Sequence, residues 1–180
     1  LGPGIIQAGL AALRRADAIV VGLRTCERLA NETERTAQLA IWSKNGPIIV
    51  SWRMGRIPVP TNLSVGSRLP LLTSATGQTF LAYLPRVYWE DIVAREGGTI
   101  KEAESLSEQV RAKGYASVSG DVIPGLSAAA APLVDARGEA KAAIALLGLD
   151  RQIKTGDIEL LVEIVRAASA ELGSAPGQSI

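Results

Sequence analysis

The segment that constrains the fold most is RLPLLTSATGQTFLAYLP, residues 68–85, where a predicted strand runs directly into a helix through a turn of small residues. Ser74 has the side chain and position of a helix N-cap, and Phe80, Leu81 and Leu84 follow at the spacing of a buried helical face. The first turn of a helix leaves about four amides without intrahelical partners, and the helix dipole adds positive charge there. The junction can therefore hold the polar group of a ligand, although an ordinary capped helix that packs into a core has the same pattern.

The length and composition predict one domain without an intrinsic affinity for nucleic acid. A chain of 180 residues can build a single core. Hydrophobic residues make up 47% of it and charged residues 21%, and the formal net charge is +1. Because this balance produces no basic field, any DNA contact has to come from another part of the protein.

The residue types argue against catalysis and metal binding. The chain contains no histidine, which removes the usual general base and the commonest transition-metal ligand. Its one cysteine, Cys26, lies on an apolar helical stripe and is interpreted as a small buried hydrophobe in a protein of a reducing compartment. Glu102, Glu104 and Glu108 fall on a solvated helix face. We therefore predict no enzyme, no metal, no cofactor and no membrane span, and a cytoplasmic location.

The apolar periodicity predicts helices first and then a hairpin. Two consecutive helices, split near Ala16-Asp17, are expected in the first thirty residues. Strand patterns follow at 36–43 and 47–54, and Asn45-Gly46 between them is a hairpin signal. Trp42 and Trp52 lie in these strands, where they can face each other, a ligand or a neighbouring subunit, or pack in the core.

The second half predicts helix, strands and helix again. A short helix follows Pro85, and a second one begins at a capping box of Thr99 and Glu102 and ends at Gly114. Strands are expected at 115–119, 126–135 and 140–148, the last two joined as a hairpin, before a final amphipathic helix. This order indicates an α+β sandwich with a mostly antiparallel sheet.

Three segments resemble the effector-binding domain of IclR-family transcriptional regulators: LGPGIIQAGLAAL, the 68–85 junction, and GYASVSGDVIPGLSAAAAPLVDARGEAKAAIALLG. The resemblance implies a GAF-like fold with about six strands, helices on both faces and a closed pocket. It also implies a domain over residues 1–173, assembly into dimers or tetramers, and an N-terminal winged helix-turn-helix domain, absent from this chain, that binds promoter DNA. The polar residues at 174–180, which include proline and glycine, predict a flexible tail.

The resemblance also implies a ligand site. The amides of Ala75 and Thr76 match positions that hold a ligand carboxylate or another polar group. Other matching positions line the pocket, namely Pro58, Thr61 and Leu69 just upstream of the junction and Val118, Leu126, Ala128, Ala145 and Leu147 on the distal strands. Trp52 or Trp42 can add an aromatic wall. Leu126 and Ala128, like Ala145 and Leu147, are two residues apart and so share one face of a strand.

The chain departs from the family's sensors of small acids at these positions. Those sensors use an acidic residue, a cysteine and serines where this chain has Val118, Ala128, Ala145 and Leu147. A buried polar ligand group without a partner costs about 1 to 3 kcal/mol, so we expect a larger, mainly apolar or aromatic effector. The alternatives are close packing of these alanines against a helix without a cavity, and a GAF-like sensor module of a different signalling protein.

Two further departures affect local structure. Gln78 stands where many relatives have lysine, so local charge near the pocket is in doubt. Glu34 occupies a position often held by glycine, which questions the turn before Thr36.

Overall fold

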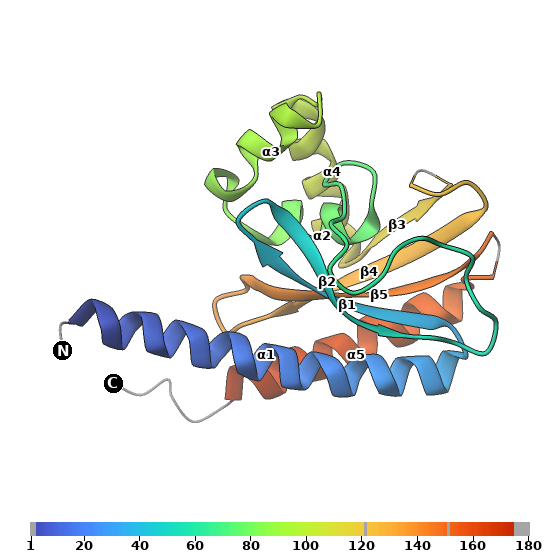
Figure 1. Ribbon diagram of the computed structural model, residues 1–180, viewed down its shortest axis with the longest axis horizontal. Helices are drawn as coiled ribbons and strands as arrows, with labels where there is room; N and C mark the ends of the chain where they lie inside the picture. Colours follow the sequence, from blue (N-terminus) through green and yellow to red (C-terminus); the bar gives the residue numbers. More distant parts are fainter. Residues whose placement is uncertain (1–2, 121, 151, 175–180) are drawn as a thin grey trace.

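The computed structural model describes residues 3–120, 122–150 and 152–174, and these form a three-layer α+β fold. In Figure 1 the helices α1 (Pro3–Thr33) and α5 (Thr155–Ser174) lie side by side on one face of the sheet. The opposite face carries α2 (Ala75–Tyr83), α4 (Ile100–Lys113), the 3-10 turn Arg86–Tyr88 and α3 (Glu90–Arg95). The predicted sandwich with helices on both faces is confirmed. The predicted tail lies outside the described residues, except for Ser174, which ends α5.

The sheet contains five described strands in the order β2-β1-β5-β4-β3, and every pairing is antiparallel. The strands are β1 (Thr36–Ser43), β2 (Gly46–Arg53), β3 (Ala116–Ser119), β4 (Leu126–Val134) and β5 (Ala140–Leu149). About six were expected. The strand predicted at the start of the 68–85 segment is reduced to an isolated bridge between Ile48 and Arg68. Pro70 limits this strand, because proline cannot donate to a strand ladder.

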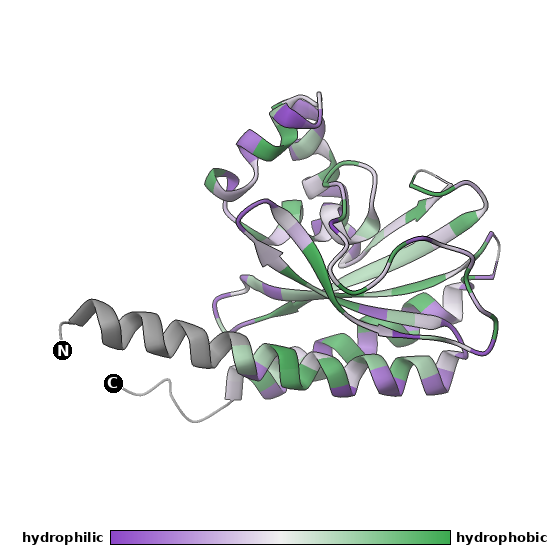
Figure 2. Cartoon of the chain, in the orientation of Figure 1, coloured by the Kyte–Doolittle hydropathy of each residue, from purple (hydrophilic) through white to green (hydrophobic). Residues whose placement is uncertain are grey.

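The strands alternate between two apolar layers. On β5, Ile144 and Leu146 face α1 and α5, whereas Ala145 and Leu147 face the α2 side. Figure 2 shows hydrophobic residues along the central strands and along the stretch of α1 beneath them. Each large aliphatic side chain buried in these layers stabilises the fold by about 1.5 to 3 kcal/mol. Because both faces are covered, residues of either parity are removed from water.

The split predicted near Ala16-Asp17 is wrong, because α1 runs without a break from Pro3 to Thr33. Neither residue breaks a helix, and the exposed Asp17 leaves the apolar stripe of the following turns intact. Cys26 lies on that stripe and is fully buried. Burial raises the pKa of its thiol to about 12, which confirms the interpretation of Cys26 as a small core residue.

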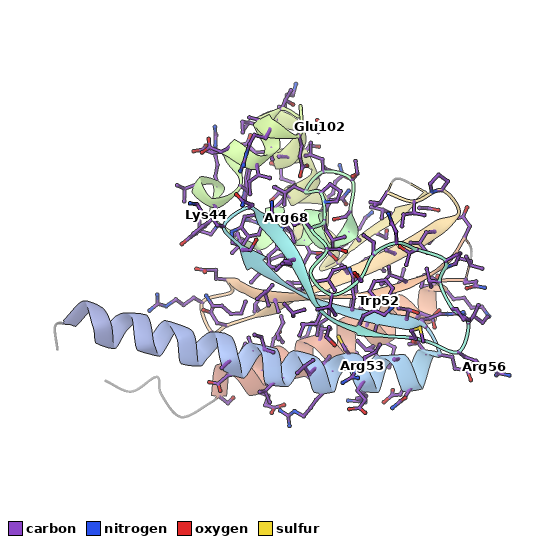
Figure 3. All side chains as sticks on the ribbon, in the orientation of Figure 1. Lys44, Trp52, Arg53, Arg56, Arg68 and Glu102 are labelled. Carbon is purple, nitrogen blue, oxygen red and sulfur yellow. The ribbon has the colours of Figure 1, made fainter. Side chains whose placement is uncertain are left out.

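The two hairpin tryptophans lie apart on the sheet. Trp42 pairs with Pro47 and tilts against Phe80, with ring centroids 5.5 Å apart, whereas Trp52 pairs with Gln38. In Figure 3, Trp52 lies near the middle of the molecule and Arg56 at its outer edge. Both tryptophans are half-buried and pack against core clusters, so they do not face each other.

Glu34 adopts a left-handed conformation, with φ of 57°, in the turn between α1 and β1. A residue other than glycine destabilises the folded state by roughly 1 to 2 kcal/mol in this conformation. We therefore expect Glu34→Gly to raise the free energy of unfolding by about 0.5 to 1 kcal/mol, after subtraction of the extra chain entropy of glycine. Urea unfolding measures the change.

The control for this prediction is Glu34→Ala. It removes the same exposed Glu34–Arg56 ion pair, in which N and O lie 3.4 Å apart, but keeps a Cβ in the left-handed region. Equal stability of the glycine and alanine variants would contradict the strain argument.

Candidate functional site

A small cavity lies between the N-terminus of α2 and the face of the sheet that carries this helix. Its volume is about 30 Å³, and most of its walls are aliphatic. The lining residues come from four strands, the α2 junction and two loops: Gln38, Leu63, Leu69, Ser74, Ala75, Thr76, Val118, Val122, Ile123, Leu126, Ala128 and Leu147.

The first turn of α2 points free donors at this cavity. Ser74 is the N-cap: its Oγ accepts from the Gly77 amide at 2.9 Å and donates to the carbonyl oxygen of Pro70. The N-cap prediction is therefore confirmed. The next two amides, of Ala75 and Thr76, have no acceptor among the described residues. Both residues are buried, so neither amide is compensated by bulk water.

A polar side chain from β1, Gln38, lines the cavity next to the first turn of α2. Gln38 is only 3% exposed, and its Nε2 donates to Oγ1 of Thr76 at 3.0 Å. Its other amide atom, Oε1, is buried and has no hydrogen-bond partner among the described residues. An acceptor without a partner therefore lies beside two donors without partners.

The cavity gathers most of the predicted positions. The two junction residues and five apolar ones line it: Leu69, Ala75, Thr76, Val118, Leu126, Ala128 and Leu147. These residues are up to 78 positions apart in the chain, and sheet pairing brings them together, since Ala128 pairs with both Val118 and Leu147. Their role in ligand binding remains a prediction.

Four predicted positions do not line the cavity. Ala145 is fully buried and packs with residues of α2, which makes it part of the floor below that helix. Trp52 packs against the same cluster from its edge. Pro58 is exposed, and the half-buried Thr61 uses its Oγ1 to accept from the Leu63 amide at 3.0 Å. The loop that carries the last two presents Leu63 to the cavity instead.

The sequence reasoning also missed residues that the cavity does contain. Leu63, Val122 and Ile123 come from irregular loops, where no periodicity indicates which side chain points inward. Gln38 had a detectable signal: Ala37, Leu39 and Ile41 define one face of β1, so Gln38 lies on the other. Alternation of this kind indicates a strand with one buried face, whereas a sheet covered on both sides buries residues of both parities.

The cavity wall carries no lysine or arginine among the described residues. Figure 3 shows Lys44, Arg53, Arg56 and Arg68 distributed along the hairpin and the following loop, and none of them lines the cavity. Gln78 is buried, and its Nε2 donates to the carbonyl oxygen of Leu72 at 2.8 Å, so it supports the turn before α2. The main-chain donors of α2 are therefore the positive element at this site.

The fold is that of a known family. The family model for the C-terminal region of the bacterial transcriptional regulator IclR matches residues 10–174. The chain belongs to this family. It is 28% identical to the HTH-type transcriptional repressor AllR of Klebsiella pneumoniae over 98% of this chain and 70% of that protein. It is also 28% identical to the HTH-type transcriptional regulator BhcR of Paracoccus denitrificans, over 98% of this chain and 67% of that protein.

Solved IclR-type structures agree with this assignment. HmgR of Pseudomonas aeruginosa superimposes with a TM-score of 0.82 and 30% identity, over 98% of this chain and 75% of that chain. IclR of Thermotoga maritima, with a TM-score of 0.77 and 20% identity, covers 96% of this chain and 75% of its own and shows the shared fold. As an IclR C-terminal domain, the chain is the effector-binding part of a transcriptional regulator.

The relatives also bear on the predicted absence of catalysis. They are named as transcriptional regulators and repressors, which agrees with the prediction that this IclR domain is not an enzyme. Among the described residues, no three acidic, cysteine or histidine side chains gather as a metal-binding group. Within the same part of the chain, no helix is long and apolar enough to cross a membrane.

Proposed function

We propose that this domain binds a small, mainly apolar effector whose one polar end accepts hydrogen bonds from the amides of Ala75 and Thr76. The observation that carries the proposal is the pair of buried amides at an apolar cavity for which the described part of the chain offers no acceptor. A carboxylate suits this position, because a helix N-terminus stabilises negative charge and offers donors in a fixed direction.

The composition of the walls supports an apolar ligand body. Val118, Ala128 and Leu147 offer no hydrogen bond where a second polar group of a compact acid would lie. Burying such a group without a partner costs about 1 to 3 kcal/mol. We therefore expect aromatic or branched carboxylic acids to bind more tightly than glyoxylate or pyruvate.

Binding requires the loops over the cavity to move. A volume of about 30 Å³ has room for one or two water molecules, whereas sites for small ligands usually measure about 300 to 1,000 Å³. Leu63, Val122 and Ile123 lie on irregular segments, and the prolines and glycines around them leave few ladder bonds to break. Displacement of these three side chains enlarges the site without disturbing the sheet.

The same movement offers a route to regulation. An effector that favours the open arrangement shifts the population of the domain towards it, to the extent of its differential affinity. In the intact protein we propose that this shift reaches promoter DNA through an N-terminal helix-turn-helix domain and through contacts between subunits of a dimer or tetramer. A GAF-like sensor of another signalling protein is the second candidate, but the match to regulators over 98% of this chain favours the first.

The test of this function is Ala75→Pro. Proline is accepted at the first helical position, and Ser74 already has the extended conformation, with φ of −98° and ψ of 142°, that a residue before proline prefers. The substitution deletes one amide donor and leaves the helix in place. We expect binding of an aromatic acid to weaken by roughly tenfold to a hundredfold, the equivalent of one charge-assisted hydrogen bond.

Isothermal titration calorimetry with phenylacetate, benzoate, glyoxylate and pyruvate measures this loss, and Ala75→Gly is the control because it keeps the amide. Tight binding of glyoxylate or pyruvate with no response to any aromatic acid would overturn the proposed ligand class. Unchanged affinity in a folded Ala75→Pro variant would overturn the role of the amides.

A further inference from the structure

Gln38 carries the one buried side-chain nitrogen or oxygen atom of the cavity that has no hydrogen-bond partner within the described residues. Its amide nitrogen, Nε2, donates a hydrogen bond to Oγ1 of Thr76 at 3.0 Å, and this bond orients the side chain. Its oxygen, Oε1, is buried and without a donor. Ser74, a further polar side chain of the cavity wall, has a hydroxyl that already donates to Pro70 and accepts from Gly77.

An unpaired acceptor in this place is costly to the free protein. A buried oxygen that loses its water without gaining a donor destabilises the folded state, and such groups are rare in native structures. The residues directly opposite Gln38 in the sheet are largely apolar: Trp52 on β2 and Ala145 on β5. Neither Trp52 nor Ala145 donates a hydrogen bond to Oε1 of Gln38. Close packing alone would be served better by methionine or leucine at this position.

The position of the acceptor relative to the donors limits the ligand. Gln38 is bonded to the side chain of Thr76, whose own amide is one of the two free donors. A ligand that reaches both must carry its hydrogen-bond donor within a few bonds of its carboxylate. An α-hydroxy acid with an apolar body has this arrangement of groups.

We propose that Gln38 is a specificity-determining residue that accepts a hydrogen bond from a hydroxyl group next to the effector's carboxylate. This inference rests on the proposed function of the cavity and adds a requirement to it. The carboxylate is held by the amides of Ala75 and Thr76, the hydroxyl donates to Oε1 of Gln38, and the apolar body lies along Val118, Ala128 and Leu147. An acid without that hydroxyl leaves Oε1 unpaired in the complex.

Three acids of nearly the same shape separate donor from acceptor. Mandelate carries a hydroxyl beside the carboxylate, 2-methoxy-2-phenylacetate carries an oxygen that can only accept, and phenylacetate carries neither. Calorimetry on the 180-residue chain is expected to give mandelate, as one of its enantiomers, at least about tenfold tighter binding than either of the others, because a site with a buried acceptor rejects ligands that lack the donor.

The variant that tests the residue is Gln38→Met, which keeps the side-chain volume and removes the acceptor. In this variant we expect phenylacetate to keep its affinity and mandelate to lose its advantage and bind no more tightly than phenylacetate, because its buried hydroxyl then lacks an acceptor. Gln78→Met is the matched control: it replaces a buried glutamine whose amide donates to Leu72 outside the cavity wall, and it should keep the preference for mandelate. Gln38→Leu serves as a second variant if Gln38→Met does not fold, as judged by circular dichroism.

The outcomes separate this inference from the proposed function. Binding of phenylacetate and mandelate with equal affinity to the unaltered chain overturns the role of Gln38 and leaves an apolar-acid site standing. A preference for mandelate that survives in the folded Gln38→Met and Gln38→Leu variants does the same. If none of the three acids nor any other aromatic acid binds to the unaltered chain, the proposed function itself falls, and the inference falls with it.

Discussion

Replacement of Gly77 by alanine is expected to destabilise the domain by about 3 kcal/mol or more, the upper end of the cost of overpacking. A Cβ at this position would lie 2.1 Å from the carbonyl oxygen of Pro70 and 2.5 Å from Cα of Leu71. Both contacts are with backbone, so no side chain can rotate away. Helix propensity alone predicts the opposite sign, because alanine is favoured over glycine inside a helix by about 1 kcal/mol.

The turn below Gly77 is held too firmly to move aside. The Leu71 amide donates to the carboxylate of Glu96 at 2.9 Å, and the Pro70 oxygen accepts from the hydroxyl of Ser74. Relief of the clash must therefore shift α2 outward and disturb the bond between Ser74 Oγ and the Gly77 amide. Because this bond fixes the first turn, the free amides of Ala75 and Thr76 move as well.

Gly156→Ala is the matched control, since Gly156 lies in α5 and an added Cβ would meet nothing within 4 Å. We expect this variant to gain up to about 1 kcal/mol. Chemical denaturation of both variants, followed by circular dichroism, measures the two changes. A Gly77→Ala variant as stable as the unaltered chain would show that the α2 junction is not packed against the Pro70–Leu71 backbone.

The elements with strong local signals could be predicted from the sequence. The N-cap of the predicted capping box is present, as the Glu102 amide donates to Thr99 Oγ1 at 3.2 Å, and Gly114 ends α4 in the left-handed region. The hairpin at Asn45-Gly46 and the strands 126–134 and 140–149 also follow the pattern. In each case the signal depends on neighbours within a few residues.

The parts that depend on long-range contacts could not be predicted in this way. The strand expected before the α2 junction failed because one edge of β2 offered it a single bridge, at Ile48 and Arg68, rather than a ladder. The unpaired oxygen of Gln38 arises only because α2 covers that part of β1. The loops that place Leu63, Val122 and Ile123 over the cavity carry no periodicity at all.

The same limit applies to the alanines on the α2 side of the sheet, where a cavity and close packing were both open interpretations. The structure supports each at a different position. Ala128 lines the cavity and is half-buried, whereas Ala145 is fully buried below α2. Both alanines have the same parity relative to that face, so only the position of the helix distinguishes them.

This difference predicts that replacement by valine changes the stability to different extents at the two positions. Ala145→Val places two extra methyl groups where the sheet and α2 already touch, and we expect a loss of about 1 to 3 kcal/mol in the free energy of unfolding. Ala128→Val directs the same groups into the cavity of about 30 Å³, so the stability should change by less than about 1 kcal/mol. Thermal and urea unfolding of the two variants provide the comparison.

For ligand binding we expect the larger effect at the other position: Ala128→Val should weaken the affinity, and Ala145→Val should retain it. With the cavity wall filled by Ala128→Val, an aromatic acid must displace the added methyl groups as well as the loops, and we expect its affinity to fall by roughly tenfold or more. Ala145→Val lies below the wall and should retain affinity wherever the domain is folded. If Ala128→Val binds the tightest acid of the calorimetric series as well as the unaltered chain does, that acid lies elsewhere, because a ligand along Val118 and Leu147 cannot avoid the side chain between them.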